Sequence, residues 1–334
     1  MKPSPRIILG SAAAALIIAS IILSLAFFKK DQSYIFLTSQ KNRFDLNFSI
    51  KKTDQDNFQK ILASLGIPQE VKDGVNFELD STSSARLNFL TPVKTNLTLK
   101  DKVINFSGET SVPLISNQPT VEQIKVPNST NVAIFAPDLK SFVKARLNLA
   151  ENISAWIDKN FSGQNGSYLV IYGLNPDYSL LVRKDQINFD ELKNLKDTNG
   201  DTLYKEEASG DVKLHFLQIP NINSDKQQTL TFFQLDEYQV MSSSPDAAKS
   251  LIDAQKSSPS HKFPKGDSPK QAALIIEFSN PDENIISDQA ESFLLQPWER
   301  PNSPKAKLAS SLKQIRDASF ALKERSFSGL INLK

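Results

Sequence analysis

The sequence predicts an α+β protein, in which a single N-terminal transmembrane helix precedes antiparallel sheets with packed helices. The first observation is residues 7–28, IILGSAAAALIIASIILSLAFF, which hold no charged side chain. A helix of that length spans roughly 33 Å, against about 30 Å of bilayer hydrocarbon. The second is that later segments alternate apolar and polar residues and are separated by short helical patterns. That mixture is typical of helices packed on one face of antiparallel sheets.

The apolar segment is expected to stay on the protein as a membrane anchor. A helix satisfies its own backbone hydrogen bonds, as any segment crossing alone must do. The segment also exceeds the core of about 7–15 residues found in signal peptides. Cleavage after Ala26, where Ser24 and Ala26 supply small residues, is the alternative. Because long domains are translocated largely regardless of nearby Lys and Arg, we expect the body on the extracytoplasmic side of a cell membrane.

The composition excludes several classes of function. A net charge of +2 provides no field that would recruit nucleic acid. The chain contains no Cys, which excludes disulfides, zinc thiolate sites, Cys nucleophiles and a thioether lipid anchor. An exported body without disulfides fits a bacterial cell envelope better than a eukaryotic secreted domain.

The segment after the anchor predicts a first α+β unit, residues 31–112. Asp54–Leu65 places apolar side chains on one helical face and is stopped by Gly66 and Pro68. Alternating patterns predict strands before and after this helix, at residues 33–38, 43–51, 75–79, 85–89, 95–100 and 103–109. Residues 113–129 are rich in Pro and polar side chains and are predicted to be a linker.

A second unit, residues 130–256, is predicted to repeat the same order of elements. It begins with a strand at 131–135 that is apolar enough to be buried, followed by a long amphipathic helix at 139–159. A helix at 189–195 then lies among strands at 167–172, 178–184, 201–206, 212–217, 229–234 and 238–243. Corresponding elements of the two units lie about 134 positions apart, which predicts an internal duplication.

Residues 257–334 are predicted to be either a partial third unit or the completion of the second sheet. A helix at 245–255 leads into a disordered-looking loop at 256–271, KSSPSHKFPKGDSPKQ, and a strand at 273–280 follows. A helix near 307–316 and a closing hairpin, residues 319–323 and 328–333, complete the chain. With the anchor at 1–30, this gives five segments.

Two segments carry a resemblance to a known family. They are Pro127–Asp138 (PNSTNVAIFAPD), a strand leading to a helix, and Asp236–Lys249 (DEYQVMSSSPDAAK), a strand leading to an Ala-rich helix. Together they resemble a family of uncharacterised bacterial proteins with one N-terminal membrane segment and an exported α+β body. The resemblance implies location and architecture, and it supplies no catalytic residue.

The sequence yields no catalytic, cofactor-binding or metal-binding residue. His215 and His261 are the only histidines; His215 is expected to be a half-exposed structural residue of a strand, and neither has partners at a metal or triad spacing. Asp197–Asp201 (DTNGD) resembles the start of a calcium loop, but Thr202 and Ala208 stand where that loop needs Gly and Glu. An ordinary Asn-Gly turn therefore explains it better.

One nucleophile pattern and one basic loop remain. Ser-x-x-Lys, the pattern of penicillin-interacting enzymes, occurs at Ser141–Lys144 and also at Ser49–Lys52 and Ser310–Lys313. The companion Ser-Asp-Asn and Lys-Thr-Gly elements are absent from the sequence, so the pattern carries little weight. The loop from Lys256 to Lys270 could touch anionic headgroups or a wall polymer, although a solvated loop is the simpler interpretation.

The function expected from these observations is binding or scaffolding by a membrane-anchored extracytoplasmic protein. Its expected partners are membrane lipid through the N-terminal helix and an envelope protein or apolar ligand. One alternative is a carrier or sensor of a lipid or other apolar molecule in a cavity between sheet and helices. The other is an envelope hydrolase of an unrecognised type, which would need convergent polar side chains in one cleft.

Overall fold

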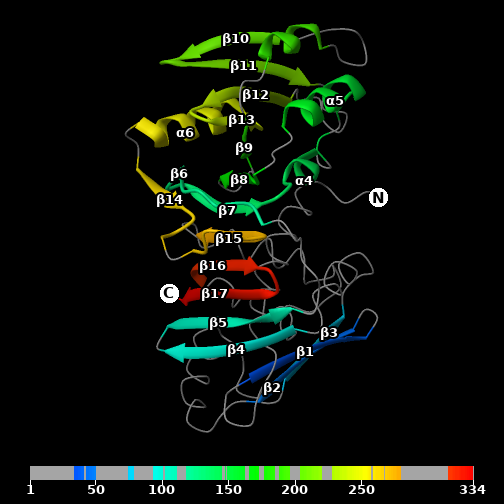
Figure 1. Ribbon diagram of the computed structural model, residues 1–334, viewed down its shortest axis with the longest axis vertical. Helices are drawn as coiled ribbons and strands as arrows, with labels where there is room; N and C mark the ends of the chain where they lie inside the picture. Colours follow the sequence, from blue (N-terminus) through cyan, green and yellow to red (C-terminus); the bar gives the residue numbers. More distant parts are fainter. Residues whose placement is uncertain are drawn as a thin grey trace, which may run out of the picture. The chain divides into compact units, whose positions relative to one another are not determined.

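The computed structural model describes the chain from β1 to β17, with gaps (Figure 1). The described residues are 34–40, 43–49, 74–78, 93–100, 102–110, 118–144, 147, 149–161, 165–172, 177–184, 188–195, 204–219, 228–256, 259–266, 268–279 and 315–333. The chain divides into two compact units, one comprising residues 1–116 and 277–334 and the other residues 117–276.

The second unit is built on an antiparallel sheet. Its strands follow the spatial order β10 (Tyr204–Ser209), β11 (Val212–Ile219), β12 (Gln228–Leu235), β13 (Tyr238–Ser242), β9 (Asp177–Arg183), β8 (Ser167–Tyr172) and β7 (Thr130–Ala136). Strand β15 (Leu274–Ser279) lies next to β7, and its residues 274–276 belong to this unit. A separate two-stranded ribbon pairs β6 (Ile124–Pro127) with β14 (Ser260–Phe263).

Two tight turns set the register of the sheet. Gly210, at φ +62°, begins the turn between β10 and β11, in a backbone region that favours glycine. Asp236, at φ +50°, makes the turn between β12 and β13, and Asp is among the residues that tolerate this region. The first turn pairs Ser209 with Val212 and therefore places Glu206 directly opposite His215.

One face of this sheet packs against helix α5 (Glu151–Asn160). Phe232, which is fully buried, lies in register with Met241 of the next strand. The ring of Trp156 from α5 meets Phe232 edge-on at 5.2 Å between centroids, and Phe161 lies 5.9 Å from the same ring. Burial of these aromatic side chains stabilises the packing of α5 on this face.

The ribbon of β6 and β14 packs against the opposite face. Successive residues of a strand point to opposite faces, so Tyr168 points away from the face that its neighbour Leu169 shares with Phe232. Tyr168 meets Phe263 of β14 edge-on at 6.2 Å and Tyr238 of β13 edge-on at 5.7 Å. Helix α6 (Pro245–Lys256) contacts β6, β9, β12 and β13.

The first unit contains two antiparallel groups of strands. One follows the order β16 (Ile315–Lys323), β17 (Ser326–Leu333), β5 (Val103–Thr110) and β4 (Val93–Lys100). Phe106, Phe320 and Phe327 stack across it, with centroids 6.4 Å and 6.0 Å apart. Gly329 lies under the Phe106 ring, since a Cβ there would come within 2.1 Å of it. The other group is a three-stranded sheet of β1 (Tyr34–Gln40), β2 (Arg43–Ser49) and β3 (Gly74–Glu78).

The expected α+β fold class is wrong, because the described residues form mostly antiparallel sheet with few helices. Helical structure in the described part of the chain is confined to α4 (Lys140–Lys144), η1 (Phe189–Asn194), α5 and α6. The predicted helix at 139–159 splits, since Ala150 has an extended backbone, ψ 149°, just before α5. The six residues of η1 form a 3₁₀ helix, as short helical segments often do. Helical periodicity in the sequence therefore overestimated the helical content.

The predicted internal duplication also fails. In the duplicated scheme β2 corresponds to β9 and β3 to β10. Strand β2 pairs with β3, whereas β9 pairs with β8 and β13 and not with β10. Similar element order in the sequence thus arises from hairpins that are joined differently in space.

Two segments expected to be loop or linker contain strands. The loop at 256–271 contains β14, because Phe263 is fully buried and fixes this part of the chain. Residues 113–129 contain β6, whose Val126 is also fully buried. The proposed anchor at 7–28, the helix at 54–65 and the strand at 85–89 lie outside the described residues. In the part of the chain that the structure describes, no helix has both the length and the apolar character needed to cross a membrane.

Candidate functional site

The Ser-x-x-Lys pattern at Ser141 and Lys144 does not form a nucleophile–base pair. Asp138 accepts backbone hydrogen bonds from the start of α4, and the Ser141 hydroxyl donates to its Oδ2 at 2.7 Å. Lys144 instead pairs with Asp158 of α5. Its hydrogen bond lowers the pKa of the Asp158 carboxyl. The two side chains therefore serve helix capping and the packing of α4 against α5.

His215 lies at the centre of a polar cluster that sequence reasoning missed. We define the Tyr204 cluster as Tyr204, Glu206, His215, Lys193 and Lys213. The Tyr204 hydroxyl lies 2.6 Å from Nδ1 of His215 and donates to Oε1 of Glu206 at 2.5 Å. Because its single proton is donated to Glu206, the phenol oxygen can accept a hydrogen bond from the Nδ1–H group of His215. The result is a chain of hydrogen bonds from imidazole through phenol to carboxylate.

Lysines surround the carboxylate end of this chain. Lys213 lies 2.7 Å from Oε2 of Glu206, and Lys193 lies 3.0 Å from Oε1. The hydrogen bond from Lys213, with those from Tyr204 and Lys193, lowers the pKa of Glu206 to about 2. Burial, followed by the hydrogen bond to Glu206, raises the pKa of the Tyr204 phenol. The carboxylate therefore stays ionised and the phenol stays protonated near neutral pH.

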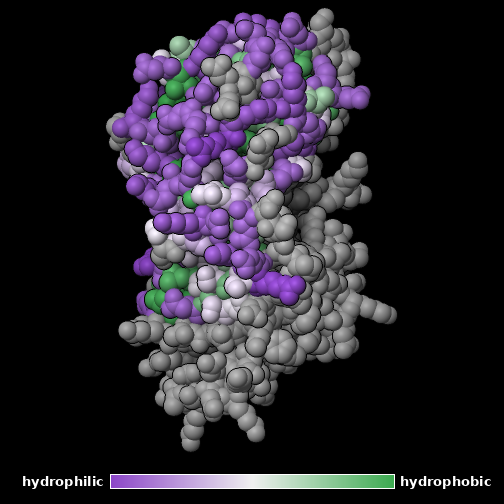
Figure 2. All heavy atoms as spheres, viewed as in Figure 1, coloured by the Kyte–Doolittle hydropathy of each residue, from purple (hydrophilic) through white to green (hydrophobic). Residues whose placement is uncertain are grey.

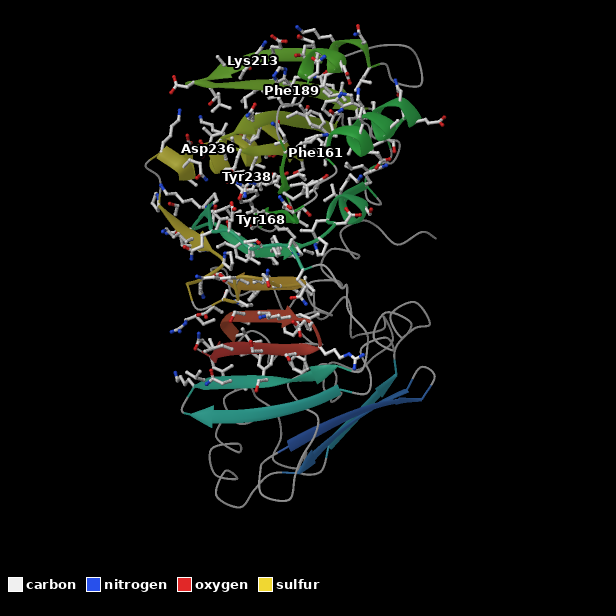
Figure 3. The ribbon with its side chains drawn as sticks, viewed as in Figure 1. Phe161, Tyr168, Phe189, Lys213, Asp236 and Tyr238 are labelled. Atoms are coloured by element: carbon white, nitrogen blue, oxygen red, sulfur yellow. The ribbon has the colours of Figure 1, made fainter. Side chains whose placement is uncertain are left out.

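The imidazole end of the chain is buried. His215 is 4% exposed, not half-exposed as expected from the sequence. The Phe189 ring stacks on the imidazole at 4.4 Å and 18°. Figure 3 labels Phe189 near Lys213 of β11. Burial lowers the pKa of His215, so the ring is neutral near pH 7. The burial and stacking of this ring favour a structural role.

A second polar cluster fastens residues 118–123 to the sheet. The Tyr168 hydroxyl donates to the Glu122 carbonyl at 2.9 Å and accepts from the Glu122 N–H at 3.0 Å. The Glu122 carboxylate pairs with Arg183, which also pairs with Glu237 at 2.6 Å. Burial raises the pKa values of Tyr168 and Tyr238. Both phenols thus act as neutral hydrogen-bonding groups that hold the entry to β6 in place.

A third cluster lies on the ribbon of β6 and β14 and at the adjoining end of α6, and we call it the lysine ribbon: Lys125 of β6, Lys262 of β14 and Lys256, the last residue of α6. Lys125 and Lys262 lie directly opposite each other in the register, and both are exposed. Lys125 donates to the Gln255 carbonyl at 3.3 Å at the end of α6, and Lys256 follows Gln255. Among the described residues no ion pair links these three lysines to a carboxylate.

Several other lysines of the same unit do pair with a carboxylate. Those on α4, α5, η1, β10 and β11 each lie within 4 Å of a carboxylate; they are Lys140, Lys144, Lys159, Lys193, Lys205 and Lys213. Lys184, Lys249 and Lys270 of this unit also form no ion pair among the described residues, but only Lys125 and Lys262 face each other directly across a pair of strands. This cluster is the candidate interaction surface.

His261 is the remaining sequence-based candidate in the part of the chain that the structure describes. His261 lies on β14, where Nδ1 is 3.2 Å from the Asn128 amide oxygen, and burial together with Lys265 lowers its pKa. The Asp197–Asp201 segment and the patterns ending at Lys52 and Lys313 lie outside the described residues. Across the described ranges, no group of three His, Asp or Glu side chains could hold a metal ion.

The hairpin register was the signal that could have revealed the Tyr204 cluster. A two-residue turn at Gly210 fixes Glu206 opposite His215, and a period of two places Tyr204 on the same face. No local signal pairs Lys125 with Lys262, because β6 and β14 are far apart in the sequence and their pairing depends on tertiary packing.

Comparison with known proteins adds no further assignment. The chain matches no protein-family model, no curated protein and no solved structure.

Proposed function

We propose that the chain is a membrane-anchored extracytoplasmic protein that works by binding or scaffolding through the outside of its body. The uncharged apolar segment 7–28 supports the membrane location. The absence of Cys in a chain of this length supports a bacterial envelope. Both arguments come from the sequence, and the arrangement of charged side chains supports the mode of action.

The observation that carries the proposal is a contrast in the second unit between polar side chains bonded inside the body and lysines exposed on its surface. Ser141, Lys144 and His215 belong to the residue types that serve in catalysis, and each is held in an internal contact. The lysine ribbon, by contrast, has exposed charge without a carboxylate partner. The exposed lysines can therefore contact another molecule, which favours a binding function over an enzymatic one. Figure 2 shows a visible face that is mostly hydrophilic over the described residues.

Strand addition at the sheet edge is a weaker mode of binding for this unit. Strand β10 is the outermost described strand beside β11. Its exposed Lys205 and Glu207 form an ion pair at 3.4 Å along the edge. Charged side chains on an edge strand discourage pairing with another strand. The lysine ribbon is thus the better candidate surface.

Native mass spectrometry of the full-length protein, extracted gently from its own membrane, tests this function. Retention of a second polypeptide or of several salt-labile lipids would support a binding or scaffold protein. One small molecule per chain, retained in high salt and lost on denaturation, would overturn it in favour of a carrier of an apolar ligand. Turnover of an envelope substrate by the bare monomer would overturn it in favour of a hydrolase.

A further inference from the structure

We propose that the lysine ribbon docks the body onto the anionic headgroups of the bilayer in which the chain is anchored. This inference rests on the proposed function, because it requires residues 7–28 to hold the chain at a membrane. It adds the partner and the surface: lipid headgroups on one side, and Lys125, Lys256 and Lys262 on the other.

The register of the ribbon is unfavourable without an anion. Residues directly opposite in an antiparallel pair have their Cβ atoms about 4.5–5.5 Å apart, and like charges at such positions destabilise the pair. Lys125 and Lys262 occupy such positions. Among the described residues the Lys125 ammonium contacts the Gln255 carbonyl, at a helix end where a cation is favoured. Lys262 lacks such a contact, so an external anion would relieve the repulsion.

The ribbon is held rigidly from its other side. Ile124 and Val126 flank Lys125 and are 6% and 0% exposed, and Phe263 next to Lys262 is fully buried. Gln255 ties the end of α6 to β6 through a hydrogen bond from its side-chain amide to the Lys125 carbonyl at 2.9 Å. Lys125 and Lys262 therefore project from a fixed platform, so less conformational entropy is lost when they bind. Lys256 extends from the end of α6, and its ammonium lies beside Gly210 in the turn between β10 and β11.

Charge and affinity together favour lipid over nucleic acid as the partner. A net charge of +2 gives no long-range attraction for a polyanion in solution. Each lysine near an anionic bilayer contributes roughly a fivefold factor to binding, so three contribute on the order of 100-fold. That is too weak to recruit a free protein, but it is enough to orient one that is already tethered, because tethering supplies a high effective concentration.

The test uses the full chain reconstituted in nanodiscs, with one environment-sensitive fluorophore. The chain has no native Cys, so Ser129→Cys places a single label on the exposed turn after β6. We expect a blue shift in nanodiscs containing phosphatidylglycerol, no shift in phosphatidylcholine alone, and loss of the shift in high salt. A label at Ala155→Cys, on the exposed side of α5, should not shift in either.

Matched charge variants complete the test. Replacing Lys125, Lys256 and Lys262 with Gln should lower the docked-to-undocked ratio on the order of 100-fold. Replacing Lys159, Lys205 and Lys213, which are exposed and paired, removes the same charge and should leave docking unchanged. Equal loss in both sets, or a shift that persists in phosphatidylcholine, would overturn the inference. A chain that does not remain in the nanodisc would instead contradict the proposed membrane anchor.

Discussion

The Tyr204 hydroxyl lies 2.6 Å from Nδ1 of the buried His215 and links that ring to the Glu206 carboxylate. This contact joins β10 to β11 at the edge of the second unit. It also places a neutral imidazole between an aromatic ring and a lysine-bound carboxylate. The stability of this edge should therefore depend on pH.

We expect the free energy of unfolding to fall as the pH drops below about 6.5, the ordinary pKa of His. Burial lowers the pKa of His215 in the folded state, so below 6.5 the unfolded chain binds more protons than the folded one. The loss continues until the pH reaches the folded pKa. Glu206, with its folded pKa of about 2, contributes a further loss only between its ordinary value of 4.5 and about 2.

Denaturant unfolding between pH 7 and about 5, where carboxylates change little, measures the histidine effect. His261 also has a lowered pKa, so His215→Gln and His261→Gln are compared separately and together. Each single variant should flatten the pH dependence in part, and the double variant should remove most of it. A wild-type slope that survives in the double variant would rule out this explanation.

Tyr168→Phe should destabilise the second unit by about 1–3 kcal/mol, the cost of leaving buried polar groups unpaired. The Tyr168 hydroxyl both donates to and accepts from the backbone of Glu122. Hydrogen exchange at the Glu122 amide should accelerate in this variant. Tyr172→Phe, which removes a 3.2 Å bond to Ser179 elsewhere in the sheet, is the control. Unchanged exchange at Glu122 would contradict the proposed fastening.

Phe232→Ala should cost about 3–5 kcal/mol, the range for a large aromatic side chain removed from a packed core. Phe232 is fully buried and contacts both Trp156 and Phe161. Trp156 fluorescence should report the change, since its ring loses its edge-on partner. Phe216→Ala, on the next strand and 8% exposed, should cost less. Equal losses would argue against α5 packing on Phe232.

Fluorescent penicillin should not label the chain at Ser141. Its hydroxyl is bonded to Asp138, and the lysine three residues later is paired with Asp158, so no base is available to activate the serine. Wild type and Ser141→Ala should give the same background on a denaturing gel. Labelling of the wild type that disappears in Ser141→Ala would restore the acyl-transfer hypothesis.

The strands were easier to predict from the sequence than the helices or the site. Alternation and tight turns located β8, β9, β11, β12 and β13 closely, because hairpins are specified by neighbouring residues. The helix expected at 139–159 broke at Ala150, where the backbone turns extended without a Pro or Gly to mark the position. Strand β14 was missed because Ser, Pro and Lys surround the single buried Phe263.

The two clusters differ in how far sequence could have found them. The Tyr204 cluster follows from one turn and a period of two, so only the step of pairing its strands was missing. The basic character of residues 256–270 was evident from the sequence. Its pairing with Lys125 was not, because it arises from burial of Phe263 and Val126 on a shared ribbon.

The account depends most on the membrane anchor and the side on which the body lies. Alkaline washing of membranes from a bacterial host that makes the full chain, followed by external protease on intact spheroplasts, tests both together. The account predicts that the intact, uncleaved chain stays with the washed membrane and that external protease digests its body. Release by the alkaline wash, or a body that external protease cannot reach, would contradict it.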